Sequence, residues 1–332
     1  YIFLRRFSAT TEKEVVAALD TLLSKGMKRL LFDLRGNSGG YLEQAAAISD
    51  QFITTIDTLV YTMGKIKESN QVFRSSKNKG RGDYSLIVMI NRGSASASEI
   101  VSGAVQDLDR GLVVGETSFG KGLVQRQLPL DTGSAIRVTI ARYYTPSGRL
   151  IQRPYEDGND LAYYRELYET DRESKIDSLK ELRPKFKTKS GRTVYGGGGI
   201  TPDIYIPFKS TINIETAKVL RNPKRPFFNF TSKRAVNYKN KFDSFDEFKR
   251  GWDVPDSLFK SFLDHLESDS IDVVRDSLSR DIDYISNRIK SELAGSIWGK
   301  NESTNLRLLM DNQVSEALKH FNEADAFLKS IN

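Results

Sequence analysis

Short apolar runs alternate with amphipathic stretches in the first third of the chain. The runs have the length and the Leu, Ile and Val content of buried strands. They occupy residues 1–7, 30–34, 86–90 and 112–114. Apolar positions at helical spacing occupy residues 15–23, 41–52 and 96–108. This β-α-β-α order predicts an α/β fold around a central, partly parallel sheet.

The pattern changes to alternation after residue 123. Residues 123–127 and 135–141 have the period of two strands, and the sequence Asp131-Thr132-Gly133 between them is typical of a turn, so we expect a β-hairpin. Residues 154–195 are polar and rich in Tyr and Lys, which predicts an excursion before strand-like sequence returns at 196–207.

Helical spacing dominates the last part of the chain, in residues 257–294 and 305–330. A chain of 332 residues also exceeds what one small core usually holds. We therefore predict two domains, which are a core of residues 1–207 and a mainly helical C-terminal domain of residues 208–332.

Composition narrows the possible chemistry. Cysteine is absent, so disulfides, thiolate metal sites and a cysteine nucleophile are excluded. The net charge is +7, but the Lys and Arg residues are interleaved with Asp and Glu and form no long basic block. No nucleic-acid partner is therefore expected. The two histidines, His265 and His320, lie in helical sequence far from every glycine-rich turn, which disfavours a Ser-His-Asp triad or a histidine metal centre. A hydroxyl nucleophile activated by lysine or by carboxylates remains.

The small residues at 91–100 connect a predicted strand to a predicted helix. A serine at the start of a helix is well placed as a nucleophile, because free N–H groups there can stabilise an oxyanion, and the Ala97 N–H is the natural donor. The sequence Ser96-x-x-Glu99 is also a good helix capping box, and serines in this local pattern are far more often caps than nucleophiles.

Two further turns carry candidate groups. Residues 115–121 match the phosphate-binding pattern GxxxxGK, but Gly122 replaces the hydroxyl residue that would hold magnesium, and strand-like sequence follows. Lys121 can instead point into an enclosed site, where burial disfavours its charged form. The third turn, residues 33–40, exposes N–H groups, and Gly39 or Gly40 could supply a second oxyanion donor. A tight connection that needs glycine explains that turn as well.

Five segments together resemble the carboxyl-terminal processing peptidases of the S41 type, also called tail-specific proteases. They are residues 33–40, 93–100, 117–125, 143–149 and 198–203. The resemblance covers about residues 1–207 and implies a crotonase/ClpP-like protease core with β-hairpin strands.

The resemblance also assigns roles to particular residues. It selects Ser96, rather than Ser94 or Ser98, as the nucleophile of a serine endopeptidase, and Lys121 as its general base. Gln125 would orient the lysine. Residues i and i+4 of an extended strand are roughly 13 Å apart, so this contact predicts a bulge or a shortened backbone. For the oxyanion hole the resemblance implies Ala97 and a glycine, of which we prefer Gly39 without excluding Gly40.

The implied reaction is acyl transfer to a serine, and it needs no metal or cofactor. The implied substrates are polypeptides with apolar C-termini, and the implied location is the cell envelope or periplasm. Members of the family generally carry a PDZ domain before the core, and none precedes Tyr1 in this sequence. For the helical domain, a homo-oligomer contact or an adaptor role is a hypothesis. The alternatives are a noncatalytic peptide- or protein-binding scaffold and a nucleotide-dependent enzyme.

Overall fold

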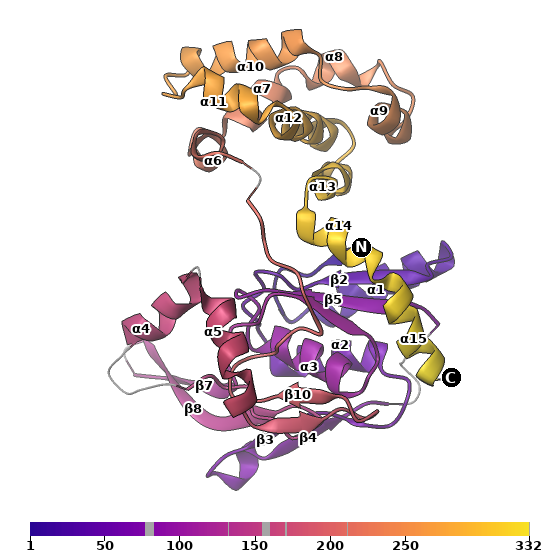
Figure 1. Ribbon diagram of the computed structural model, residues 1–332, viewed down its shortest axis with the longest axis vertical. Coiled ribbons are helices and arrows are strands. Elements are labelled where there is room, and N and C mark those ends of the chain that lie inside the picture. Colours follow the sequence, from indigo (N-terminus) through magenta and orange to yellow (C-terminus); the bar gives the residue numbers. More distant parts are fainter. Residues whose placement is uncertain (77–82, 132, 155–159, 170, 211, 332) are drawn as a thin grey trace. The chain divides into compact units, whose positions relative to one another are not determined.

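The computed structural model describes residues 1–76, 83–131, 133–154, 160–169, 171–210 and 212–331. The chain forms two compact units. The first comprises Tyr1–Pro207 together with Ala317–Asn332, and the second comprises Phe208–Glu316 (Figure 1).

A five-stranded parallel sheet forms the centre of the first unit, in the order β1-β2-β5-β6-β11. Its strands are β1 (Ile2–Phe3), β2 (Arg29–Asp33), β5 (Ser85–Ile90), β6 (Leu112–Gly115) and β11 (Ile204–Tyr205). Every residue of β5 and β6 is buried, as expected of a parallel sheet that is covered on both faces. The predicted β-α-β-α order is present, although the strand expected at residues 1–7 is limited to Ile2–Phe3.

Three helices each follow a strand of this sheet in the chain. They are α1 (Thr11–Ser24), α2 (Leu42–Phe52) and α3 (Ala97–Asp107). All residues of α3 are buried, and its sequence contains small residues that let its neighbours approach closely. α2 and α3 pack against each other, and α3 contacts β5 and β6 as well as β3 of a second sheet. The helix that begins next to Ser96 is therefore enclosed between two sheets.

The second sheet is antiparallel and has the order β4-β3-β8-β7. Its strands are β3 (Thr58–Met63), β4 (Gln71–Arg74), β7 (Leu123–Pro129) and β8 (Ala135–Tyr144). β7 and β8 form the predicted hairpin, in whose turn Thr132 lies outside the described residues. The sequence analysis assigned no strand to β3 and β4, which are separated by the short 3₁₀ helix η1 (Lys67–Ser69).

The polar excursion predicted at 154–195 contains regular structure. Its elements are α4 (Asp160–Arg165), η2 (Glu166–Tyr168), α5 (Arg172–Leu179), η3 (Lys180–Leu182) and the hairpin of β9 (Lys185–Lys187) and β10 (Thr193–Tyr195). Residues 155–159 and 170 of the excursion lie outside the described residues.

The end of the chain belongs to the first unit. α15 (Phe321–Ile331) packs against β5 and β6. Asp325 accepts hydrogen bonds from the Arg29 guanidinium (2.8 Å) and from the Ser85 hydroxyl. The sequence analysis placed residues 317–332 in the helical domain, because an amphipathic helix does not reveal which core its apolar face covers.

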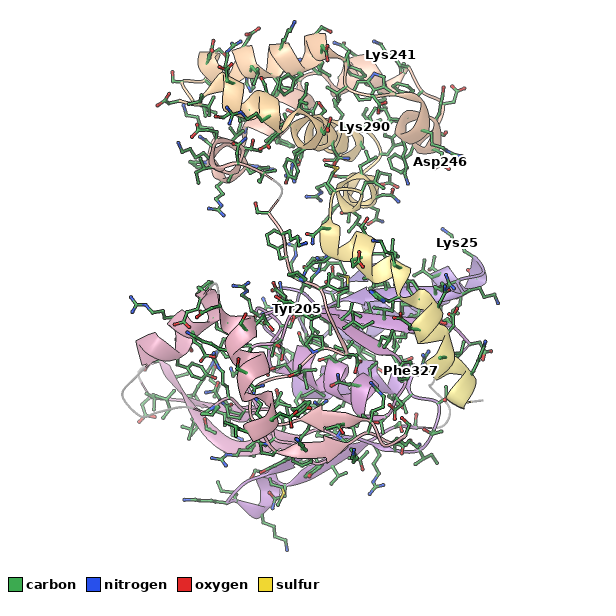
Figure 2. All side chains as sticks on the ribbon, in the orientation of Figure 1. Lys25, Tyr205, Lys241, Asp246, Lys290 and Phe327 are labelled. Carbon is green, nitrogen blue, oxygen red and sulfur yellow. The ribbon has the colours of Figure 1, made fainter. Side chains whose placement is uncertain are left out.

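The second unit is helical. Its helices are α6 (Ile214–Arg221), α7 (Pro226–Ser232), α8 (Ala235–Lys239), α9 (Phe245–Gly251), α10 (Asp256–Ser268), α11 (Arg275–Arg280), α12 (Ile282–Ile297) and α13 (Lys300–Leu308), and α14 (Asn312–Lys319) crosses the boundary. Its core is rich in phenylalanine. Lys290 (Figure 2) is buried and donates to the Lys249 carbonyl at 2.9 Å. No helix in the described part of the chain is long and apolar enough to cross a membrane.

Candidate active site

Ser96 lies at the junction between β5 and α3. Its backbone has φ of 55° and ψ of −112°, a conformation that non-glycine residues rarely adopt and that costs about 1–3 kcal/mol. A strained conformation of this kind persists only where the surrounding structure fixes it. The Ser96 residue is partly exposed, so its hydroxyl is within reach of a substrate.

The two neighbouring serines hold the turn together. Ser94 Oγ donates to the Leu34 carbonyl and Ser98 Oγ donates to the Asn37 carbonyl, each at 2.8 Å. Both serines are fully buried. Burial therefore separates Ser96 from the two other serines, a distinction that the residues alone did not give.

Lys121 lies in the turn between β6 and β7, and it is partly exposed. Its Nζ donates to Gln125 Oε1 at 3.4 Å, so the predicted contact between these side chains is present. The register of β7 and β8 shifts between Val124 and Gln125, but the extra residue of this bulge belongs to β8, not to the segment between Lys121 and Gln125. Among the described residues, no hydrogen bond joins Lys121 Nζ to Ser96 Oγ. A strand follows Lys121 where the phosphate-binding pattern needs a helix.

A buried carboxylate joins the turn before α3 that contains Ser96, the serine turn, to the turn between β6 and β7 that contains Lys121, the lysine turn. Glu99 is fully buried and accepts hydrogen bonds from the backbone N–H groups of Ser96 (2.7 Å) and Lys121 (2.9 Å). It also accepts from the Gly120 N–H (2.7 Å) and from the Ser118 hydroxyl (2.5 Å). The sequence analysis recognised Glu99 only as a capping residue. Its spacing to Ser96 is local, whereas its contacts with 118–121 depend on the tertiary fold.

Burial raises the pKa of Glu99 to about 7, against the effect of these four donors, which favour the ionised form. The folded protein thus holds this proton more tightly than the unfolded chain, whose carboxyl has a pKa near 4.5. The resulting contribution to stability is complete below about pH 4.5 and is lost as the pH rises through about 7.

We expect the Glu99→Gln variant to lack this pH dependence. Between pH 5 and pH 8 the wild-type protein should lose about 3 kcal/mol more unfolding free energy than the variant. Urea titrations at the two pH values measure the difference, with the exposed Glu43→Gln variant as the control. Equal pH slopes in the wild type and the Glu99→Gln variant would contradict the prediction.

Tyr143 forms a second bridge between the two turns. Its hydroxyl donates to the Ser96 carbonyl at 3.1 Å and also contacts the Lys121 carbonyl. Burial raises the pKa of Tyr143 well above its usual value, so the hydroxyl keeps its proton and acts as a donor. The backbones of Ser96 and Lys121 are thus fixed to each other by Glu99 and Tyr143 independently.

The glycine-rich turn lies against the start of α3. A Cβ on Gly39, whose φ is +99°, would lie 2.8 Å from Ser96 Cβ and 3.0 Å from the Ala97 nitrogen, so only glycine fits there. The Gly39 N–H donates to Asn37 Oδ1 at 2.9 Å. Among the hydrogen bonds of the described residues, none uses the N–H of Gly40 or of Ala97. The structure therefore brings Ser96, Ala97 and Gly39 together and leaves two N–H groups available.

A cleft of about 1,360 Å³ opens beside these residues. Lys121 and Gln125 line it, together with the aromatic rings of Phe119, Tyr163 and Tyr164. These rings pack on one another, with centroid distances of 5.5–6.2 Å. The cleft can hold an extended peptide with apolar side chains.

The excursion anchors the lysine turn. Arg172 of α5 is buried and donates to the carbonyls of Thr117 (2.9 Å) and Ser118 (2.8 Å). The adjacent Glu173 accepts from the Thr117 hydroxyl at 2.9 Å. Sequence reasoning gave this segment no role, because long-range contacts of polar residues leave no periodic signal.

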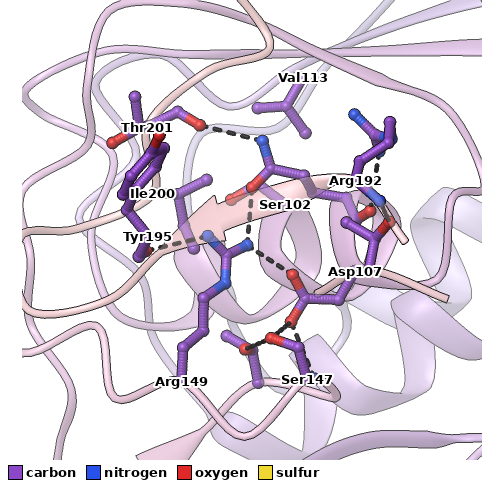
Figure 3. Close-up of polar contacts among 12 residues, drawn as sticks. Ser102, Asp107, Val113, Ser147, Arg149, Arg192, Tyr195, Ile200 and Thr201 are labelled. Carbon is purple, nitrogen blue, oxygen red and sulfur yellow. Dashed lines mark hydrogen bonds and ion pairs between the residues drawn. The ribbon is translucent and has the colours of Figure 1, made fainter. Parts of the chain in front are cut away.

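A buried ion pair holds the other end of α3 (Figure 3). Arg149 Nη2 lies 2.6 Å from Asp107 Oδ1, and both side chains are completely buried. Arg149 also donates to Gln106 Oε1 (2.6 Å), and the Ser147 hydroxyl donates to Asp107 Oδ2 (2.7 Å). Gln106 in turn donates to the Thr201 carbonyl (2.9 Å). The segments 143–149 and 198–203 thus stabilise the helix that carries the serine turn.

Comparison with known proteins shows that part of this α/β unit is similar to a family of peptidases. Residues 1–157 match the model of peptidase family S41. Residues 224–299 match a family of unknown function (DUF8443).

Curated relatives of the first unit are C-terminal processing proteases. The carboxyl-terminal-processing protease of Synechocystis sp. is 41% identical over 146 residues, which are 44% of this chain and 34% of the relative. The corresponding protease of Bartonella bacilliformis is 42% identical over 158 residues, which are 46% of this chain and 36% of the relative. A solved structure of a photosystem II D1 C-terminal processing protease is 26% identical, with a TM-score of 0.44, and the match covers 62% of this chain and 41% of that one. The matched region thus spans about a third of the curated relatives.

Proposed function

We propose that the chain is a serine endopeptidase that uses a Ser96–Lys121 dyad and cleaves polypeptides near their C-terminus. The observation that carries the proposal is the shared carboxylate of Glu99, which binds the backbones of the partly exposed Ser96 and of Lys121. The proposal is supported by the S41 match of residues 1–157.

In the proposed reaction, the neutral Lys121 amine accepts the proton of Ser96 Oγ while this oxygen attacks the carbonyl carbon of the scissile peptide bond. The proton then passes to the leaving amine as the C–N bond breaks. A water molecule, deprotonated by Lys121, then attacks the carbonyl carbon of the acyl ester, and the lysine passes this proton to Ser96 Oγ as the ester C–O bond breaks. Gln125 orients the lysine through the contact with its Nζ.

The Ala97 N–H and a glycine N–H would stabilise the tetrahedral oxyanion. Both donors must be free of other acceptors when the substrate binds. Since the Gly39 N–H already donates to Asn37, the free N–H of Gly40 supports Gly40 as the second donor. We further propose that the core has the crotonase/ClpP-like arrangement, in which the serine helix follows a parallel strand.

The aromatic lining of the cleft supports substrates with apolar C-termini. We propose that the protein acts in the cell envelope or periplasm, as the processing of exported polypeptides would require. Fractionation of cells that produce the natural protein tests this location. A homo-oligomer or adaptor contact through the helical unit remains a proposal that size-exclusion chromatography with light scattering can test.

Mass spectrometry of a digested reporter tests the activity. An unfolded reporter polypeptide with an apolar C-terminus should yield fragments that end near that terminus, and a fluorophosphonate probe should label Ser96. The proposal is wrong if the reporter stays intact and the probe labels no serine of the folded protein.

The second candidate is a noncatalytic peptide-binding scaffold. It is favoured by the geometry of the lysine, because no hydrogen bond among the described residues links Lys121 Nζ to Ser96 Oγ. A scaffold would bind the reporter and leave it intact, whereas a peptidase whose lysine moves on binding would cleave it.

A further inference from the structure

Basic side chains line the proposed substrate cleft. Among the described residues that line it, no aspartate or glutamate occurs. The basic residues are Lys121, Arg92, Arg137, Arg142 and Arg153. A cleft lined by charges of a single sign concentrates the electric field and attracts the opposite charge.

Two of the four arginines have carboxylate partners. Arg92 lies 3.5 Å from Glu116, and Arg153 lies 3.0 Å from Glu166. Arg137 and Arg142 are exposed. Among the described residues, neither of these two has a carboxylate within ion-pair distance. Their charges are therefore available to a ligand.

A β-bulge directs both free arginines to the cleft. Residues five positions apart in a regular strand point to opposite faces. In β8 the pairing moves from Arg142 opposite Leu123 to Arg137 opposite Gln127, with one extra residue of β8 inserted between them. The insertion restores a common face, and both arginines line the cleft. A regular hairpin would present only one of them to a substrate.

We propose that Arg137 and Arg142 form a carboxylate-binding subsite, which selects polypeptides that carry a carboxylate beside the scissile bond. The subsite rests on the proposed peptidase function and specifies its substrates. Guanidinium groups bind carboxylates through paired, charge-assisted hydrogen bonds. The carboxylate can be an acidic side chain or the terminal carboxylate of the polypeptide, because both present the same group.

The register gives the expected spacing. Leu123 and Gln127 are four residues apart in β7, which corresponds to roughly 13 Å. An extended substrate alongside the hairpin therefore meets Arg142 near Lys121 and meets Arg137 about four residues further along. A substrate with two carboxylates at this spacing can engage both arginines.

Binding to the Ser96→Ala protein tests the subsite without relying on turnover. Fluorescence anisotropy is measured with peptides of one apolar sequence that differ in a single group: a free or amidated C-terminus, and Glu or Gln at successive positions. We expect each engaged carboxylate to tighten binding by about 1.5- to 5-fold, which is typical of an exposed ion pair. The advantage should shrink from low salt to about 1 M salt, where screening is nearly complete.

Variants of the β7–β8 hairpin show which arginines cause the preference for carboxylate peptides. Arg137→Gln and Arg142→Gln should each reduce the preference for the carboxylate peptides. Arg126→Gln is the matched control, because Arg126 pairs with Val138 on the other face of the same hairpin and does not line the cleft. The control should keep the preference of the wild-type protein. Reading the terminal and side-chain series separately shows which source of carboxylate is used.

Equal affinity for the carboxylate and neutral peptides at low salt would overturn the subsite. So would a preference that survives in the Arg137→Gln/Arg142→Gln double variant. Cleavage of both peptide types at equal kcat/KM would refute the subsite and leave the peptidase function intact. Selective binding of the carboxylate peptides by a protein that cleaves no peptide would support the subsite and refute the peptidase function.

Discussion

Replacing Ser96 with alanine, or Lys121 with methionine, is expected to lower kcat by roughly 10⁴- to 10⁶-fold, as removal of a nucleophile or its base does in other serine hydrolases. Without the hydroxyl no acyl ester can form, and without the amine no group within the described site accepts the serine proton. KM should change little, because the cleft that binds the substrate stays intact. Steady-state cleavage of the reporter polypeptide measures both constants.

Methionine is unbranched and nearly as long as lysine, so the packing of the turn should be preserved. Lys187→Met, in the exposed β9, is the control for loss of a lysine and should keep full activity. Circular dichroism should show that all variants are folded. Turnover within tenfold of the wild type in the Ser96→Ala protein would refute the nucleophile, and the same result for Lys121→Met would refute the base.

Replacing Arg149 with methionine is expected to lower the unfolding free energy of the first unit by about 3–5 kcal/mol. The substitution leaves the carboxylate of Asp107 buried without its cation, since both side chains are completely buried in the wild-type protein. At roughly 2–4 °C per kcal/mol for a unit of this size, the melting temperature should fall by about 6–20 °C. Thermal unfolding followed by far-UV circular dichroism measures the change.

Two internal references support this measurement. Lys175, whose ion pair with Glu169 is exposed, provides the control variant Lys175→Gln, which should melt like the wild type. Both tryptophans, Trp252 and Trp298, lie in the second unit, so their fluorescence follows that unit separately. An unchanged melting temperature in Arg149→Met would show that the ion pair adds no stability.

The layout of the first unit follows from features that the sequence displays directly. The buried strand before Ser96, the amphipathic α2 and the turn chemistry of the β7–β8 hairpin depend on local patterns, and these gave the order of elements. The site needed more than local patterns. Ser96 could be separated from its two neighbours only by the family resemblance, and the structure separates them by burial.

The missed features depend on contacts between distant residues. Glu99 looks like a capping residue because the sequence shows only its separation from Ser96, not the turn at 118–121 that completes its hydrogen bonds. The extra residue of β8 is invisible in a sequence that alternates imperfectly. α15 was assigned to the wrong neighbours, since amphipathicity identifies a buried face without identifying its partner.

The return of α15 to the first unit has a consequence for dissecting the protein. The helical unit is an insertion whose two ends, at residues 208 and 316, both continue into the first unit. A stop codon after residue 207 would therefore remove Asp325 and the helix that packs against β5. Loss of activity in that protein would then reflect damage to the core of the first unit. An excision that rejoins residue 207 to residue 317 through a flexible linker would keep that helix. Such an excised protein is the form in which the contribution of the helical unit to substrate choice can be measured.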